Sequence, residues 1–394
     1  MQSLTGIIQN YAWGSFDGIP TALGTAQTDD PQAEYWLGAH PKAPSVLADG
    51  STLDVFLAER PELIGQASVE HLGDRLPFLL KVLSARQALS LQAHPSRAQA
   101  IEGYARENRD DIPLDYPGRN YRDDWPKPEA MIALTEFHGL CGFRDPARTQ
   151  ELFRQLGAPA ADDYVLPLTE ADGIARVFLQ TLAIGHLFAE EAEQVVTAAH
   201  AALETAEPGS DFHIFCTTAV ELARDYPGDP GVLAGLLLNR IQLQPGDAFF
   251  MPAGNMHAYL RGTGIEIMSN SDNVLRGGLT PKHVDVDELA VVVDFTPGFP
   301  GLIEPVELTP GVLHYPTEAP EFAVFQLTTP TDAAVPAEAS ARIVLVTEGT
   351  FTLTSDGEHL TLDKGDSAFL GAGEQVTATG AGQAFLAAGG LPIP

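Results

Sequence analysis

The segment from Gly246 to Tyr259 reads GDAFFMPAGNMHAY, and a second segment from Gly365 to Ala378 reads GDSAFLGAGEQVTA. Aligned without gaps, the two segments share an initial Gly-Asp, a central apolar pair and an Ala-Gly turn. Each is a short apolar run bounded by turn residues, which predicts a strand, a turn and a second strand. His257 in the first copy corresponds to Val376 in the second. The chain therefore contains one β unit twice, once with a potential metal ligand and once without.

Further strands are expected before the first copy. The stretch 76–94 reads LPFLLKVLSARQALSLQAH, and its second half alternates leucines with the polar Ser90, Gln92 and His94. Because side chains alternate between the two faces of a strand, these polar groups are predicted to share one face. A second strand is expected at 127–134, where Lys127 and Glu129 are two positions apart.

The periodicity changes between about residues 146 and 240. TQELFRQLG, the stretch 189–206 and FCTTAVELARDY carry apolar residues at helical spacing, which predicts a helical insertion. Short strands resume at 241–267 and again from about 341 to the end, with turns at SDG, KGD and GAGE.

Charge and cysteine content narrow the classes of partner. The 394 residues suggest two or three packed units, and 53 acidic against 22 basic residues give a net charge of -31. Such a field repels nucleic acid and anionic membranes, so any phosphate site needs a local group of Lys and Arg. Only Cys141 and Cys216 occur, the first eleven residues do not resemble an export signal, and the apolar stretch 177–189 is too short to span a bilayer. We expect a cytoplasmic protein with no membrane partner.

Metal chemistry is the strongest signal from the residues themselves. Gln92 and His94 lie two apart on one strand face, and Glu129 and His257 can join them from distant segments. Imidazole, carboxylate and amide donors suit zinc or another borderline divalent ion better than calcium or a structural thiolate site. Most histidines are not ligands, and we interpret His138 and His283 as structural.

The chain resembles the type I phosphomannose isomerases over nearly its full length. The resemblance rests on these blocks: NYAWGS at Asn10, EYWLGAHPKAPS at Glu34, LPFLLKVLSARQALSLQAHP at Leu76, KPE at Lys127, and GDAFFMPAGNMHAYLRGTGIEIMSNSDNVLRGGLTPKHVDVDEL at Gly246.

This resemblance implies a mainly β fold of two cupin-type (jelly-roll) barrels with an inserted α-helical domain. We expect a catalytic barrel from residues 1–145 and 241–310, a helical domain at 146–240, and a degenerate barrel without metal at 311–394. Val376 in place of a histidine agrees with a lost metal site.

The resemblance also implies a zinc-dependent isomerase interconverting D-mannose 6-phosphate and D-fructose 6-phosphate. One Zn²⁺ per chain would be bound by Gln92, His94, Glu129 and His257. The implied partner is a small sugar phosphate, and we expect a monomer. The implied roles are supply of mannose for GDP-mannose and glycan synthesis, or use of mannose as a carbon source.

Proton transfer between C1 and C2 through an enediol needs a general acid or base beside the metal. The candidates for catalysis are Arg276, Lys127 and Glu266, and the candidates for substrate binding are Lys81, Ser90, Tyr259, Asp272 and Lys282. Arg276 resembles the family's essential arginine, although a salt bridge to Asp272 or Glu266 is an equally simple role for such a residue. Lys127 can exchange a proton or anchor the substrate.

One departure from the family pattern lies next to these residues. Many members carry histidine before the KPE lysine, whereas Pro126 stands there in this chain. Any mechanism that uses that histidine therefore needs another group here. Trp125 can stack on a sugar, but a tryptophan before proline more often packs in the core.

Two alternative functions use the same residue types. A bicupin oxygenase or decarboxylase would use iron or manganese, usually with more than two histidines, and a non-catalytic sugar-binding cupin would have no need of the complete ligand set. A fused guanylyltransferase is disfavoured because no glycine-rich nucleotide loop precedes the motifs.

Overall fold

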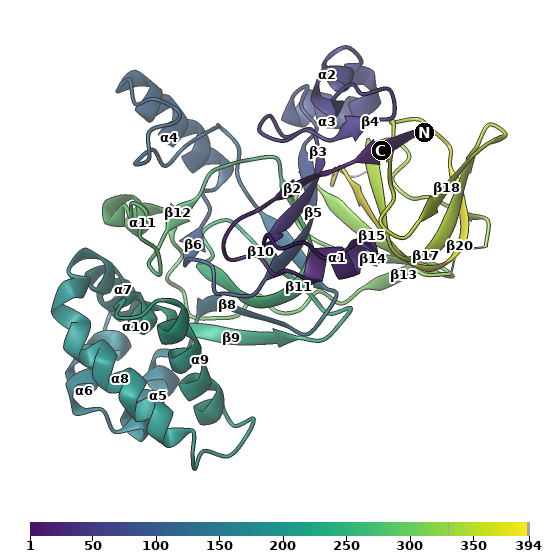
Figure 1. Cartoon of the computed structure of the whole chain (residues 1–394). Coiled ribbons are helices and arrows are strands. Elements are labelled where there is room, and N and C mark those ends of the chain that lie inside the picture. The colour runs from purple at the N-terminus through teal and green to yellow at the C-terminus, as the bar shows by residue number, and fades with distance from the viewer. Residues whose placement is uncertain (330, 392–394) are drawn as a thin grey trace.

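The computed structural model describes residues 1–329 and 331–391. Residues 330 and 392–394, which the sequence assigns to the last β unit, lie outside the described residues. Figure 1 shows two groups of strands beside each other and a cluster of helices at the far side of the first group. No helix among the described residues combines the length and the apolar character needed to cross a membrane.

The first sheet has ten strands, with β10, β7, β11, β5, β3 and β2 as neighbours in that order and four more attached to them. Its members are β2 (Ile7–Gln9), β3 (Glu34–Gly38), β5 (Phe78–Ala85), β6 (Gln92–Ala93), β7 (Glu129–Ala133), β8 (Phe137–Phe143), β9 (Leu238–Leu243), β10 (Ala248–Met251), β11 (His257–Ser269) and β12 (Leu275–Arg276). The long strand β11 pairs antiparallel with β5, β6, β7 and β8. It therefore connects all of the segments predicted to carry ligands.

The second sheet also has ten strands. Its members are β1 (Gln2–Thr5), β4 (Val46–Leu47), β13 (Val306–Thr309), β14 (Val312–Tyr315), β15 (Ala323–Leu327), β16 (Ala333–Ala334), β17 (Arg342–Ser355), β18 (Glu358–Asp363), β19 (Ser367–Leu370) and β20 (Thr377–Ala388). The N-terminal strand β1 pairs with β19, so the first residues of the chain join the sheet formed by the C-terminal segment.

Helices cluster between β8 and β9, where the periodicity predicts them. They are α5 (Pro146–Leu156), α6 (Pro159–Val165), α7 (Gly173–Ala183), α8 (Ala189–Ala202), α9 (Asp211–Asp225) and α10 (Gly231–Gly235), with the 3₁₀ turns η2 (Leu166–Thr169) and η3 (Gly185–Phe188). The other helices are α1 (Gly18–Leu23), α2 (Leu53–Ala58), η1 (Pro61–Ile64), α3 (Gln66–Leu72), α4 (Arg97–Arg109) and α11 (Val286–Val292). The three expected helical stretches are confirmed as α5, α8 and α9.

The repeated GD…AG segments form equivalent elements. β10 and β19 begin two residues after Gly246 and Gly365 respectively, and both glycines have a positive φ, of 94° and 92°. Gly254 and Gly373, in the following turns, also match, with φ of 79° and 83°. Only glycine adopts such angles without strain, which explains why glycines are among the residues shared by the two copies.

Strand β5 shows how the first sheet positions the site. Every residue of β5 is buried, and alternate side chains have different surroundings. Phe78, Leu80 and Val82 pack in a core that contains residues of both sheets, such as Ile343. Lys81 projects from the opposite face into a cavity. One face of the first sheet therefore packs on the second sheet, and the other face walls the cavity.

One predicted element is wrong in part. The strand expected to run to His94 ends at Ala85, and only Gln92 and Ala93 return to strand geometry as β6. Between Ala85 and Gln92 the backbone hydrogen-bonds to other segments. The N–H of Leu89 donates to the carbonyl oxygen of Tyr259, and that of Leu91 donates to the carbonyl oxygen of Gly278. Ser90 and Gln92 nevertheless line the same cavity, together with Leu89.

Candidate metal centre and substrate cavity

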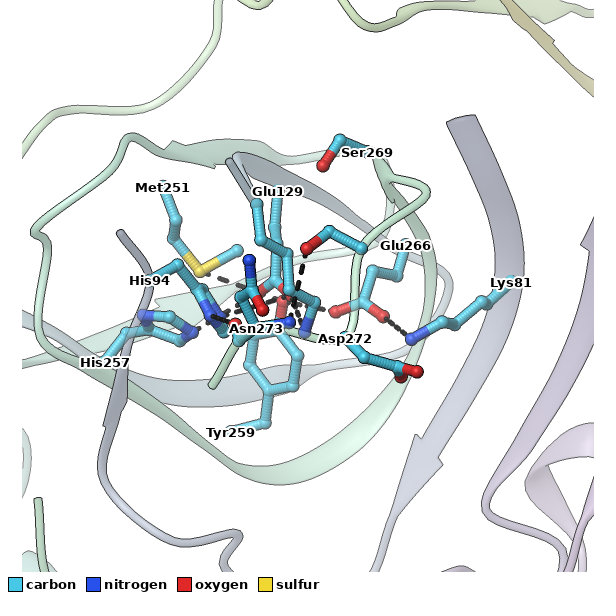
Figure 2. A network of polar contacts seen from close by, with 12 residues as sticks. Lys81, His94, Glu129, Met251, His257, Tyr259, Glu266, Ser269, Asp272 and Asn273 are labelled. Atoms are coloured by element: carbon cyan, nitrogen blue, oxygen red, sulfur yellow. Dashed lines mark hydrogen bonds and ion pairs between the residues drawn. The ribbon is translucent and has the colours of Figure 1, made fainter. Parts of the chain in front are cut away.

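Three of the four predicted ligands form a buried cluster at one end of the first sheet. Ligand atoms of His94, Glu129 and His257 all lie within 4.8 Å of one another, and the side chains are 1–2% exposed. Glu129 places one carboxylate oxygen 3.4 Å from Nε2 of His94 and the other 3.3 Å from Nε2 of His257. Figure 2 shows the two imidazoles and the carboxylate pointing toward one another. The strands that begin at Glu129 and at His257 bring them there.

Backbone carbonyls orient both imidazoles. Nδ1 of His94 lies 2.8 Å from the carbonyl oxygen of Asn273, and Nδ1 of His257 lies 3.1 Å from that of Asn255. Because a carbonyl only accepts, each Nδ1 carries a proton, and Nε2 is the nitrogen that has a lone pair when the imidazole is neutral. This arrangement is the one that metal-binding histidines need.

The protonation states also suit a cation. Burial, together with the neighbouring Lys127, lowers the pKa of His94 to about 4, so this imidazole stays neutral. Burial alone would raise the pKa of Glu129, but Lys127 and the histidines hold it well below its ordinary value. Among the described residues, Nε2 of both histidines and one oxygen of Glu129 are buried without a hydrogen-bond partner. The neutral His94, the imidazole of His257 and a carboxylate, with unsatisfied atoms facing one point, fit a divalent ion such as zinc.

Gln92 lies beside this cluster. It is opposite His257 in the β6–β11 pairing and opposite Arg276 in the β6–β12 pairing. Its side chain lines the same cavity as Glu129.

The cluster opens onto a cavity of about 700 Å³. This cavity brings together every residue that the sequence nominates for catalysis or substrate binding, namely Lys81, Ser90, Lys127, Tyr259, Glu266, Asp272, Arg276 and Lys282. His138 lies elsewhere, in a network with Glu136 and Arg240, and His283 is exposed. Trp125 is buried with Arg75 packed over its ring at 4.3 Å, so it has the packing role and does not line the cavity.

Lys81 belongs to a buried ionic network at one side of the cavity. Its Nζ lies 2.8 Å from Glu266 and 3.2 Å from Glu34, and the hydroxyl of Tyr259 donates to the other oxygen of Glu266 at 2.8 Å. Burial alone would lower the pKa of Lys81, but Glu266 and Glu34 raise it above its ordinary value. Burial also raises the pKa of Glu266, and Lys81 opposes that effect. Because Glu266 is contacted by both a cation and a hydroxyl donor, we assign an ionised pair.

Sequence reasoning missed Glu34, although it begins the EYWLGAHP block. Its other oxygen accepts from the indole N–H of Trp36 at 3.0 Å. The signal was a glutamate in an otherwise apolar and fully buried strand, β3. A buried carboxylate needs a cation, and Lys81 on the neighbouring strand β5 provides it.

Asp272, another polar residue of the cavity, lies next to two basic side chains. Asp272 pairs with Lys42 at 2.7 Å and lies 3.5 Å from Nε2 of His40. Burial would raise the pKa of Asp272, but His40 and Lys42 hold it well below its ordinary value. From sequence, a salt bridge from Arg276 to Asp272 or Glu266 is a possible role for this arginine. Among the described residues, these two carboxylates instead pair with His40, Lys42 and Lys81.

A mainly β chain with a buried His/Glu/His group at the end of a polar cavity has the features of a cupin-type metal-dependent enzyme. Two family models match it: the type I phosphomannose isomerase catalytic domain over residues 1–146, and the mannose-6-phosphate isomerase cupin domain over residues 312–387. The chain belongs to the type I phosphomannose isomerase family and is an isomerase.

Individual relatives agree along nearly the whole chain. The mannose-6-phosphate isomerases of Salmonella typhimurium and Escherichia coli are each 36% identical over 97% of this chain and 98% of their own length. The rat enzyme is 33% identical over 95% of this chain and 94% of its own.

Solved structures give the same picture. A mannose 6-phosphate isomerase bound with zinc and yttrium is 35% identical, with a TM-score of 0.87 over 99% of this chain and 100% of that one. The apo form from Salmonella typhimurium is likewise 35% identical, with a TM-score of 0.88 over 99% of each chain.

Proposed function

We propose that this chain interconverts mannose 6-phosphate and fructose 6-phosphate with one zinc ion held by Gln92, His94, Glu129 and His257. The observation that carries the proposal is the convergence of unsatisfied His and Glu ligand atoms at the end of a cavity that also contains Arg276 and Lys282. When bound, the metal polarises the sugar oxygens on C1 and C2 as a Lewis acid.

The chain's own residues then move a proton through an enediol. The C2–H bond of the open-chain aldose breaks, a base takes the proton, and the proton returns to C1 while the hydroxyl proton on O2 moves to O1. Lys127, whose Nζ is ion-paired to the ligand Glu129 at 2.8 Å and lines the cavity, is a cation, and we assign it the stabilisation of the negative charge that develops on the sugar oxygens. Among the three candidates, Glu266 is the only carboxylate, and we assign the proton transfer to it, with Lys81 and Tyr259 holding it in position.

Arg276 and Lys282 are the proposed phosphate contacts. Burial lowers the pKa of Arg276, as does Arg122, and burial with Arg276 lowers the pKa of Lys282. A dianionic phosphate between them would offset this repulsion and bind through charge-assisted hydrogen bonds. Ser90 and Tyr259, which line the same cavity, are proposed to contact the sugar hydroxyls.

The proposed architecture is a catalytic cupin barrel, an inserted helical domain and a metal-free C-terminal cupin barrel. Strand register supports the last assignment. Glu129 is opposite Met251 in the β7–β10 pair, and Arg342 is opposite Leu370 in the equivalent β17–β19 pair. An arginine therefore stands where the first unit has its carboxylate ligand, and Val376 stands where it has His257.

We also propose a cytoplasmic monomer that supplies mannose 6-phosphate for GDP-mannose and glycan synthesis or uses mannose as a carbon source. Two free, buried cysteines and a ligand set drawn from a single chain support this part of the proposal.

A coupled assay with mannose 6-phosphate tests the activity. We expect turnover by the zinc-loaded chain, loss of turnover by at least about a hundredfold after chelation, and recovery on adding zinc, because the proposed transition state carries charge on metal-facing oxygens. Running the reaction in D₂O tests the enediol, since solvent deuterium should enter C1 of the product. No turnover with zinc present would refute the function, and deuterium at C1 would distinguish the enediol from a hydride shift, which carries the C2 hydrogen to C1 without exchange.

A further inference from the structure

The cations around the cavity fall into two groups. Four of them are ion-paired to carboxylates: Lys42 with Asp272, Lys81 with Glu34 and Glu266, Arg119 with Glu107, and Lys127 with Glu129. Within the part of the chain that the structure describes, no ion pair involves the other three lining cations, which are Arg122, Arg276 and Lys282. Unpaired cations gathered at one cavity are unexpected in a chain of net charge -31 and indicate an anionic ligand.

Arg122 is the member of this group that sequence reasoning did not nominate. It lies at the boundary between the cavity of about 700 Å³ and a neighbouring cavity of about 770 Å³, and it lines both. Its side chain therefore borders the cavity in which Arg276 and Lys282 lie.

Asn273 holds Arg122 against the segment that carries Arg276. The amide oxygen of Asn273 accepts from the backbone N–H of Arg122 at 2.6 Å, and its amide nitrogen donates to the carbonyl of Trp125 at 2.8 Å. The backbone carbonyl of the same asparagine orients His94. Asn273 is fully buried, so one rigid residue links the metal centre to the backbone of Arg122.

The guanidinium of Arg122 is oriented but not neutralised. It donates to the carbonyl oxygens of Leu114 and Tyr116, the second at 3.2 Å. Carbonyl oxygens fix the plane of the guanidinium and leave its formal charge in place, since they carry only partial charge. Arg122 is also close enough to Arg276 to lower the pKa of that arginine.

We propose that Arg122 is a further phosphate-binding residue of this site, acting with Arg276 and Lys282 on the phosphate of the substrate. This inference rests on the proposed function, in which the substrate is a sugar phosphate. With Arg122, cations from two separate segments can surround one dianion, whereas Arg276 and Lys282 reach it from a single stretch of chain.

The test compares Arg122→Gln and Arg122→Lys with the unmodified zinc enzyme. Two quantities are measured: kcat and KM for mannose 6-phosphate, and the Kd for inorganic phosphate by calorimetry. In Arg122→Gln we expect KM and the phosphate Kd to rise about tenfold or more, with kcat within about threefold, because a charge-assisted contact is lost. Arg122→Lys keeps the charge and should recover much of the phosphate affinity.

The matched control is Arg75→Gln. Arg75 lines only the neighbouring cavity and is paired with Asp124 at 3.1 Å, so its replacement should leave both quantities unchanged. If Arg122→Gln leaves the phosphate Kd unchanged, the inference is wrong. If Arg122→Lys is as impaired as Arg122→Gln, the arginine serves only to hold Leu114 and Tyr116, and the inference is again wrong. Absence of isomerisation by the unmodified enzyme would instead overturn the proposed function, because the phosphate Kd does not depend on turnover.

Discussion

At the scale of single residues, the proposed metal centre depends on which nitrogen of each imidazole is protonated. His94 and His257 each donate Nδ1–H to a backbone carbonyl and present Nε2 to Glu129. His138 shows the contrast, since both of its ring nitrogens face charged side chains of Glu136 and Arg240. The same residue type therefore has two functions, and the hydrogen-bond partners decide between them.

Replacing His257 by alanine should remove zinc and abolish activity, because only Gln92, His94 and Glu129 would remain to bind the ion. The measurement is zinc per chain by atomic absorption, alongside turnover. Replacing His138 by alanine is the control, and it should retain zinc even if it lowers stability. Equal zinc loss in both variants would contradict the ligand assignment.

At the scale of elements, helix α4 supports the segment that carries Arg122. The carboxylate of Glu107, near the end of α4, accepts from the backbone N–H groups of Asn120 and Tyr121. The helix begins at a capping box in which Ser96 and Gln99 satisfy each other's backbone N–H groups. The hydrogen bonds at the start of α4 therefore stabilise the helix. The other end of the same helix holds the segment that forms a wall of the cavity.

Replacing Ser96 by alanine should lower the free energy of unfolding by about 1 kcal/mol, since an N-cap acceptor is lost. Thr52, at the start of α2, makes no side-chain cap hydrogen bond, so Thr52→Ala should cost less. Urea denaturation of both variants checks this difference. An equal effect of the two changes would show that the Ser96 cap contributes nothing.

At the scale of the whole molecule, stability depends on pH because weakly acidic side chains are buried in their neutral form. Burial raises the pKa of the Cys216 thiol to about 11, and burial with nearby carboxylates raises the pKa of Tyr226 to about 12. Between the ordinary thiol value of 9.0 and the folded value, the unfolded chain loses a proton that the folded chain keeps. Stability conferred by the neutral thiol is therefore present below pH 9 and lost as the pH rises.

We expect the free energy of unfolding to fall between pH 8 and 10.5, with Cys216 contributing about 1 to 2 kcal/mol of the loss. Denaturant titrations at the two pH values measure the fall, and Cys216→Ala should make it smaller. A fall of the same size in Cys216→Ala would assign the effect to other groups, such as the tyrosines or the growing negative charge.

Much of the site could be predicted because its residues have the right chemistry in local patterns. The Gln92-Ala-His94 spacing, the KPE segment and the copy of the β unit that keeps His257 indicate a mixed-donor metal site without any knowledge of the fold. The strand limits were less accurate, because the path after Ala85 depends on distant partners such as Tyr259 and Gly278.

What the sequence alone determined was the set of local features: helices with 3.6-residue periodicity, turns that only glycine permits, and the donor types of the metal ligands. The tertiary structure decided which charges are paired. It alone shows that Lys81 is neutralised by Glu34 and Glu266, that Arg122 is not paired to a carboxylate among the described residues, and that Asn273 joins the metal centre to Arg122. The physical reason is that periodicity and turn geometry arise from neighbours in the chain, whereas ion pairing depends on distances set by packing between segments far apart in sequence.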